Sequence, residues 1–144
     1  MVSKHHPHLV RLLGQCIDID VARQHMEQIL VYEFMESHDL KTWIGPAVPT
    51  PLTLRQRLDV LIGVAKGLHY LYDFGIVHCD IKPANILLDA KMQAKIADFG
   101  LVKLSGSTSM GTSLAATQVM GTPGFVDPAY FKSHNATPAA DVHR

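Results

Sequence analysis

The chain has 144 residues, and its thirteen basic and thirteen acidic side chains give it no net charge at neutral pH. This balance excludes the basic surface that nucleic-acid binding needs, so we expect no nucleic acid as a partner. The two cysteines, Cys16 and Cys79, lack the spacing of a zinc site or a disulfide framework, which favours a reducing, cytoplasmic setting. No apolar run approaches the roughly 20 residues that span a bilayer, so we expect no membrane span in this segment, even if a longer parent is membrane-anchored.

In chain order, two strands come first. Residues 9–16 are mainly apolar and lie between a His/Pro stretch and polar residues, while residues 28–35 are rich in β-branched and aromatic side chains. We expect the two strands to pair across the polar stretch 18–27. Ser37 is then the expected N-cap of a short helix that reaches Ile44.

The clearest predicted helix begins after Thr53 and ends at Gly75. Its apolar residues recur at a spacing of three to four, which predicts one buried face. Gly63 and Gly67 weaken the helix slightly, but they permit a neighbouring segment to pack closely. The residues of the expected buried face are Leu54, Leu58, Leu61, Ile62, Ala65, Leu68 and Leu71.

Two short apolar runs, 86–88 and 95–97, are joined by polar residues and predict a β-hairpin. Asn85 precedes the first run and Asp98 follows the second, so antiparallel pairing is expected to bring both side chains to the open end of the hairpin, about 5 Å apart. A carboxylate and an amide oxygen, without histidine or thiolate, suit Mg²⁺. The sequence therefore predicts a magnesium site at this end of the hairpin.

The loop just ahead of Asn85 carries a carboxylate, Asp80, which can accept a proton, and a cation, Lys82, which can face a phosphate. Farther along, residues 104–118 are rich in Ser, Thr and Gly without a helical or strand period, which predicts a mobile loop. Thr137, followed by proline, predicts the start of another helix.

These residues resemble a known family. The run 78–85, HCDIKPAN, resembles the catalytic loop of protein kinases, and the DFG run that begins at Asp98 resembles their metal-binding motif. The resemblance implies that Asp80 orients the substrate hydroxyl and accepts its proton, and that Lys82 neutralises the transferred phosphoryl group. It also implies that Asn85 and Asp98 hold Mg²⁺. The alternative is a polar turn beside a purely structural hairpin.

The resemblance extends to the segment that would contact the nucleotide. Residues 30–35, LVYEFM, resemble the kinase hinge, in which Tyr32 would be the gatekeeper and the backbones of Glu33 and Met35 would face the adenine of ATP. Leu87 would form the floor beneath the base. The alternative for this segment is a buried strand that binds no ligand.

Residues 121–129, GTPGFVDPA, resemble the end of a kinase activation segment. Thr122 together with Lys82 is the pattern of kinases that phosphorylate Ser and Thr. The amino-acid sequences of these motifs are most similar to those of plant receptor-like kinases. Cys79 stands where many kinases have an arginine that pairs with a phosphate, so phosphorylation of the Ser/Thr-rich loop should not switch activity through that contact. Ala129 replaces the glutamate that usually ends the segment.

The fold that the resemblance implies is α+β, protein-kinase-like and partial, with 1–35 as a remnant of the small-lobe strands and hinge. Residues 36–144 would form the upper part of the helical large lobe, including the catalytic loop and activation segment. The glycine-rich loop, strand lysine and helix glutamate of kinases have no counterpart in the 144 residues. The long helix would also lose a packing partner, which leaves the stability and activity of the isolated chain open.

The resemblance implies an ATP-dependent protein Ser/Thr phosphotransferase that uses ATP and Mg²⁺ and acts on a protein hydroxyl. A second hypothesis is a truncated kinase-like interaction module that binds partners or nucleotide without turnover. The intact catalytic-loop residues favour the first hypothesis, and the missing ATP-clamping elements favour the second.

Overall fold

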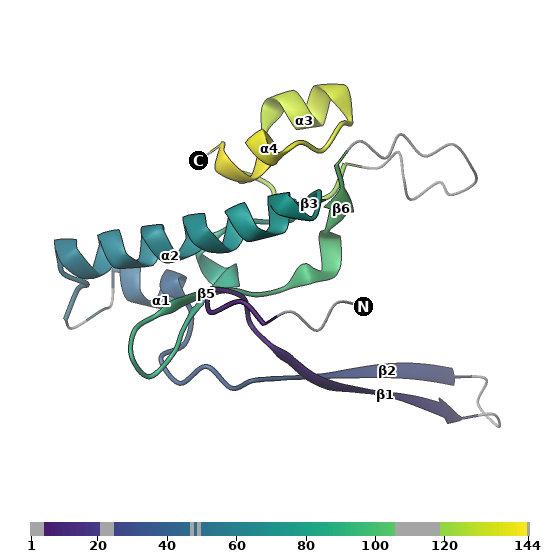
Figure 1. The fold of residues 1–144 in the computed structure, drawn as a ribbon, viewed down its shortest axis with the longest axis horizontal. Helices are drawn as coiled ribbons and strands as arrows, with labels where there is room; N and C mark the ends of the chain where they lie inside the picture. The colour runs from purple at the N-terminus through teal and green to yellow at the C-terminus, as the bar shows by residue number, and fades with distance from the viewer. Residues whose placement is uncertain (1–4, 21–24, 47, 49, 106–118, 144) are drawn as a thin grey trace.

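The computed structural model describes residues 5–20, 25–46, 48, 50–105 and 119–143. A long two-stranded ribbon projects from a body of helices and short strands (Figure 1). The ribbon consists of β1 (Leu12–Asp20) and β2 (His25–Tyr32), which pair in antiparallel orientation. The predicted pairing is confirmed, but β1 begins three residues later than expected and β2 ends at Tyr32 instead of residue 35. Both strands also extend into the stretch 18–27, which we expected to connect them, because β1 continues to Asp20 and β2 begins at His25. The residues just before β1 and just after β2 do not pair with each other as strands, because they connect the ribbon to the body. For example, the backbone N–H of Val10 donates to the carbonyl of Ile96 at 2.9 Å.

The body is organised around α2 (Leu54–Asp73), a helix of 20 residues. Thr53 caps its N-terminus in a capping box: the Thr53 hydroxyl accepts from the backbone N–H of Gln56, and the Gln56 side chain accepts from the backbone N–H of Thr53. After the helix ends, Gly75 adopts a left-handed backbone conformation with φ of 66°. Both predicted boundaries of this helix are confirmed.

A short hairpin packs against α2. It consists of β4 (Ile86–Leu88) and β5 (Ala94–Ile96), so its second strand begins one residue earlier than predicted. Side chains alternate between the two faces of a strand, and one face of this hairpin is buried against the helix while Leu87 and Lys95 lie on the other. The resulting core consists of Val60, Leu68, Leu71, Ile86, Leu88, Ala94 and Ile96.

The buried face of α2 differs from the predicted one. Leu68 and Leu71 are buried as expected, but Leu54, Leu58, Leu61 and Ile62 are 73%, 47%, 61% and 51% exposed, and Ala65 is exposed as well. The helix instead packs through the stripe that contains Gly63 and Gly67. A side chain at Gly63 would lie 2.8 Å from Nδ1 of His8, and one at Gly67 would lie 2.9 Å from the carbonyl oxygen of His8. The closest packing therefore follows the glycines and not the leucines.

Helix α1 (Leu40–Ile44) is capped by Asp39 and not by Ser37 as predicted. The Asp39 carboxylate accepts from the backbone N–H of Thr42 at 2.7 Å. Ser37 instead uses its carbonyl, which accepts from the indole N–H of Trp43 at 2.7 Å. Both residue types are good N-caps, and the sequence pattern did not distinguish the two positions.

The remaining elements surround the C-terminal end of α2. β3 (Ile76–Val77) pairs with β6 (Lys103–Leu104), a contact between two-residue strands that the sequence pattern did not predict. Helix α3 (Pro128–Ser133) follows, and α4 (Pro138–Val142) begins with proline after Thr137, as predicted.

The expected mobile loop 104–118 lies, from residue 106 onward, outside the described residues. In the part of the chain that is described, no helix is both long and apolar enough to cross a bilayer.

Candidate active site

The catalytic-loop segment is anchored by a residue far away in the sequence. Asp141, buried in α4, accepts hydrogen bonds from the backbone N–H groups of His78 and Cys79 at 2.7 and 2.8 Å. The hydroxyl of Tyr72 also approaches its carboxylate at 3.5 Å. Burial raises the pKa of Asp141 and outweighs the donated hydrogen bonds, which act to lower it. The loop backbone is thus tied to both α2 and α4.

His78 connects this loop to the residues around Asp98. Its imidazole is fully buried, and the backbone N–H of Asp80 donates to its Nδ1 at 3.3 Å. Nε2 therefore carries the proton and donates to the carbonyl of Ala97 at 3.0 Å. The ring also contacts Phe99 edge-on, with centroids 5.3 Å apart. One side chain thus links the catalytic loop to the residues on either side of Asp98.

Asp80 is the centre of a buried polar network. Its Oδ2 accepts from Lys82 Nζ at 2.6 Å and from Asn85 Nδ2 at 3.0 Å. Its Oδ1 accepts from the backbone N–H and the hydroxyl of Thr122 at 3.0 and 2.7 Å, and Lys82 also donates to that hydroxyl at 2.6 Å. Burial acts to raise the pKa of Asp80, but the hydrogen bonds from Lys82 and Thr122 outweigh it and lower the pKa. The carboxylate is therefore ionised at neutral pH.

Asn85 is buried at the end of a 3-10 turn, Pro83–Asn85, that leads into β4. Its amide nitrogen donates to the carbonyl and the carboxylate of Asp80, at 2.9 and 3.0 Å. Because both of these contacts use the NH₂ group, the amide oxygen is the end of the side chain that can act as a metal ligand. This orientation fits the ligand role that the sequence implied.

Asp98 lies at the same end of the hairpin but outside the network of Asp80. The backbone N–H of Ala97 donates to the carbonyl of Asn85, so Asp98 is one residue beyond the position opposite Asn85. Asp98 is exposed, has a left-handed backbone with φ of 62°, and accepts from the backbone N–H of Gly100 at 3.3 Å. The approach of the Asn85 and Asp98 side chains to about 5 Å stays a prediction.

A cleft of about 800 Å³ adjoins Asp98. Its wall includes Phe99, the backbone beside it, and side chains of the ribbon such as Leu12 and Tyr32. Tyr32, the expected gatekeeper, is 41% exposed. The cleft is large enough for a small ligand, and Asp98 is one of the residues that line it.

The three residues expected to face the nucleotide base lie where the ribbon joins the body. Glu33 forms an ion pair with Lys95 at 2.8 Å, and Met35 is buried at 6% exposure. Leu87 is half-buried on the outward face of the hairpin and forms an isolated bridge with Asp39. The segment from Glu33 to Met35 lies beyond the end of β2, so it is not part of a strand, and its contact with a nucleotide stays a prediction.

Sequence reasoning missed two contacts. Asp141 and His78 are 63 residues apart, and Thr122 and Asp80 are 42 residues apart, so no local pattern indicated either pair. Thr122 was noted only as part of a specificity motif, whereas the structure brings it into direct contact with Asp80 and Lys82. The resemblance of the motif was the one signal available for these residues.

The chain is similar to known proteins along nearly its whole length. The family model "Protein kinase domain" matches residues 1–143. A probable LRR receptor-like serine/threonine-protein kinase of Arabidopsis thaliana is 44% identical over 144 residues, which cover 96% of the chain and 14% of that relative. Receptor-like protein kinase THESEUS 1 of the same plant is 42% identical over 147 residues, with 99% of the chain and 16% of the relative covered. The chain thus spans about one seventh of the length of these relatives.

Proposed function

Because the chain belongs to the protein kinase family, we propose that it supplies the catalytic centre of an enzyme that transfers the γ-phosphoryl group of ATP to Ser and Thr hydroxyls of proteins. The observation that carries the proposal is the ionised carboxylate of Asp80, held on both oxygens by Lys82, Asn85 and Thr122. Such a network fixes the direction of a carboxylate that must meet a substrate hydroxyl.

In this proposal Asp80 is the proton acceptor and Lys82 is the cation beside the reacting group. The lowered pKa keeps Asp80 ionised, so it orients the hydroxyl and takes its proton as the new bond forms. Lys82 Nζ lies 2.6 Å from both Asp80 Oδ2 and Thr122 Oγ1, which holds its positive charge at the site where negative charge develops. Thr122 contacts both Asp80 and Lys82, which supports a preference for Ser and Thr hydroxyls as the acceptors of the phosphoryl group.

The donor set fits Mg²⁺. Asn85 offers an amide oxygen and Asp98 an exposed carboxylate, and hard oxygen ligands of this kind are those that Mg²⁺ takes together with phosphate oxygens. When bound, the ion neutralises charge on the phosphates of ATP. The residues assigned to hold it are Asn85 and Asp98. Among the described residues, no group of three or more His, Cys, Asp or Glu side chains is placed to hold a metal ion.

We assign the adenine site to the backbones of Glu33 and Met35 and to the side chain of Leu87. In this assignment residues 1–35 belong to the small lobe and hinge, and residues 36–144 belong to the large lobe. The partners would be proteins with accessible Ser or Thr, and the location would be the cytoplasm. These assignments are extensions of the family membership and of the geometry at the base of the ribbon.

A second candidate function is a kinase-like interaction module without turnover. Four large apolar side chains on α2 are exposed, which is more than a solvent-facing helix face usually carries, and they favour contact with another protein surface. These residues are Leu54, Leu58, Leu61 and Ile62.

Phosphoryl transfer separates the two candidates. The chain, and a longer polypeptide that contains it, are incubated with Mg²⁺, γ-labelled ATP and a mixed Ser/Thr peptide library. Asp80→Asn is expected to lower transfer by about 10²–10⁴-fold because it removes the proton acceptor. Asp18→Asn, the same substitution at an exposed position of the ribbon, should retain transfer. Equal transfer by Asp80→Asn and the original sequence would contradict the proposal, and nucleotide binding without any transfer would favour the interaction module.

A further inference from the structure

The residues that join the ribbon to the body are attached to the β4–β5 hairpin at both ends. We call residues 33–36 the linker. At its far end, the backbone N–H of Ser37 donates to the carbonyl of Leu88 at 3.1 Å, and the N–H of Leu88 donates to the carbonyl of His38 at 2.8 Å. Backbone hydrogen bonds thus attach this end to β4.

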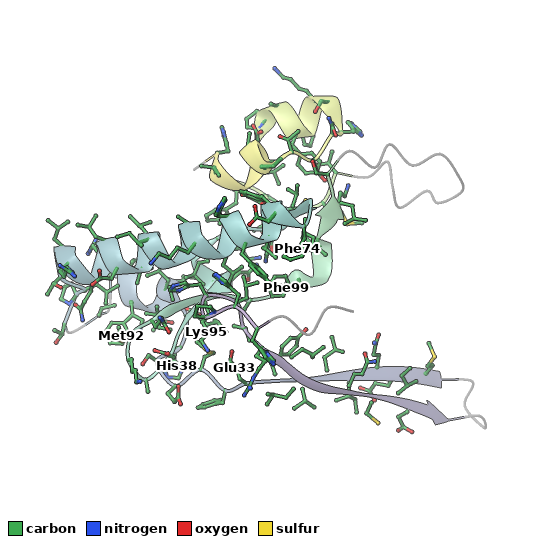
Figure 2. The ribbon with its side chains drawn as sticks, viewed as in Figure 1. Glu33, His38, Phe74, Met92, Lys95 and Phe99 are labelled. Carbon is green, nitrogen blue, oxygen red and sulfur yellow. The ribbon has the colours of Figure 1, made fainter. Side chains whose placement is uncertain are left out.

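At the near end, a side chain makes the attachment. The carboxylate of Glu33 accepts from Lys95 Nζ at 2.8 Å through one oxygen and from the backbone N–H of Arg11 at 2.7 Å through the other. The backbone N–H of Glu33 donates in turn to the carbonyl of Arg11 at 3.0 Å. Figure 2 shows Glu33 and Lys95 at the place where the ribbon meets the body. One carboxylate therefore joins the linker, the chain ahead of β1, and β5.

The position of Lys95 on the hairpin gives this ion pair a geometric role. Lys95 is the register partner of Leu87, so the two side chains project from the same face of the hairpin. That face is opposite the one that packs against α2. Leu87 is the residue assigned to the floor beneath the adenine, and the linker carries the backbone groups assigned to its edge. The Glu33–Lys95 pair consequently connects the hairpin face that carries Leu87 to the linker, whose backbone is assigned to the edge of the adenine site.

The ion pair is also shielded from water. The side chains of Lys95 and Glu33 are 15% and 20% exposed, in contrast to the i,i+4 pair Arg55–Asp59 on α2, whose side chains are 85% and 54% exposed. Burial acts to raise the pKa of Glu33, but the hydrogen bonds and charges of Lys95 and Arg11 outweigh it, so the pKa is lowered. A shielded pair with two additional backbone bonds holds its geometry better than an exposed one.

We propose that the Glu33–Lys95 ion pair positions the linker against the β4–β5 hairpin and so sets the separation between the edge and the floor of the adenine site. Glu33 and Lys95 are positioning residues in this proposal, because they act on the nucleotide through the linker backbone. The assignment of ATP as the ligand rests on the proposed function, whereas the effect of the pair on the linker does not.

Hydrogen–deuterium exchange of the full chain tests the positioning directly. Lys95→Met should make the amides of Arg11 and Glu33, whose N–H groups are hydrogen-bonded at this junction, exchange about tenfold faster, because local opening no longer breaks the ion pair. Lys95→Arg should keep slow exchange, because a guanidinium can still donate to the Glu33 carboxylate. Arg55→Met, which removes the exposed pair on α2, is the matched control and should leave the linker unchanged. Unchanged exchange of these amides in Lys95→Met, or exchange in Lys95→Arg as fast as in Lys95→Met, would overturn the proposal.

A kinetic measurement tests the consequence for the nucleotide. In an active polypeptide that contains the chain, Lys95→Met should raise KM for ATP about tenfold with kcat changed less than about twofold, since Lys95 contacts no reacting group. Lys95→Arg should restore KM. An unchanged KM beside faster linker exchange would overturn the role in the adenine site. If the unsubstituted polypeptide neither binds ATP nor transfers phosphate, the proposed function fails, and the exchange experiment still decides whether the pair holds the linker.

Discussion

Cys79 and Asp80 are neighbours in the catalytic loop, yet their surroundings shift their pKa values in opposite directions. Burial, together with the Asp141 carboxylate, raises the pKa of the Cys79 thiol to about 11. At Asp80 the effect of burial is outweighed by the hydrogen bonds from Lys82 and Thr122, and the pKa falls. At neutral pH the loop therefore presents a neutral thiol beside an ionised carboxylate.

The surroundings of Cys79 are apolar. It packs with Val77, Tyr130 and Ala136 in a second buried cluster, between β3 and α3. The Cys79 side chain carries no positive charge that could form an ion pair with a phosphate. This supports the expectation that phosphorylation does not act through this position. The Ser and Thr residues concerned lie, apart from Ser105, outside the described residues, so that expectation stays a prediction.

The two cysteines should react very differently with thiol reagents. In the native chain at pH 8, Cys16 is exposed and should be labelled by a maleimide or disulfide reagent, while Cys79 should remain unlabelled because it is buried and its pKa is raised to about 11. Intact mass should show one adduct in buffer and two in urea. Labelling of Cys79 at a rate similar to Cys16 in buffer would contradict the burial of the catalytic loop.

Among the elements, α2 carries the largest difference between expectation and structure. Its leucines suggested the buried face, but Gly63 and Gly67 decide where the neighbouring segment packs. Backbone and side chain of His8 approach the helix at these glycines, and Nδ1 of His8 also contacts the carbonyl of Ala94 at 2.8 Å. The glycines thus place the residues ahead of the ribbon between α2 and the hairpin.

This packing predicts the effect of Gly67→Ala. In an isolated helix the change would stabilise by about 1 kcal/mol, because alanine has the higher helix propensity. Here the new Cβ would lie 2.9 Å from the His8 carbonyl oxygen and 3.0 Å from Cδ1 of Ile96, so the neighbouring backbone must move. Overpacking of this kind costs about 1–3 kcal/mol, and we expect a net loss of about 1 kcal/mol or more in the free energy of unfolding.

Urea unfolding followed by circular dichroism measures this loss. Gly14→Ala is the matched control, because a Cβ at Gly14 would meet nothing within 4 Å. It should change the free energy of unfolding by less than about 0.5 kcal/mol. If Gly67→Ala were as stable as Gly14→Ala or more stable, the close approach of His8 to α2 would be wrong.

For the whole molecule, the arrangement separates a projecting ribbon from a body that holds the catalytic loop (Figure 1). The exposed fractions of the apolar side chains on the ribbon are large, with Ile17 at 55% and Met26 at 69%. Large exposed apolar surfaces on both the ribbon and α2 leave the described residues with less buried area than a self-contained domain of this length usually has.

Mg²⁺-ATP is expected to raise the melting temperature of the chain. A ligand at 100 times its Kd adds about 2.7 kcal/mol to the free energy of unfolding. EDTA or Asp98→Asn should abolish the increase if Asn85 and Asp98 hold the ion, while Asp18→Asn on the ribbon should retain it. A thermal shift of equal size in Asp98→Asn, measured by differential scanning fluorimetry, would exclude Asp98 as a ligand of the metal.

The amino-acid sequence by itself determined the local features. The helix start at Thr53, the stop at Gly75 and the proline-initiated helix after Thr137 depend on neighbouring residues and were all predicted. The hairpin between Ile86 and Ile96 followed from short apolar runs with a polar connection. The catalytic-loop motif indicated the family because its residues are contiguous, and the family match confirms that conclusion.

Only the tertiary structure decided which residues meet across long separations. It selected the glycine stripe of α2 over the leucine stripe, and it brought Thr122 and Asp141 to the catalytic loop from 42 and 63 residues away. The physical reason is that a periodic pattern specifies that a helix has an apolar face, whereas the closest fit between two packed surfaces depends on side-chain volumes on both partners. Among the partners of Asp80, Lys82 and Asn85 are close in the sequence, and only the packing of the molecule adds Thr122.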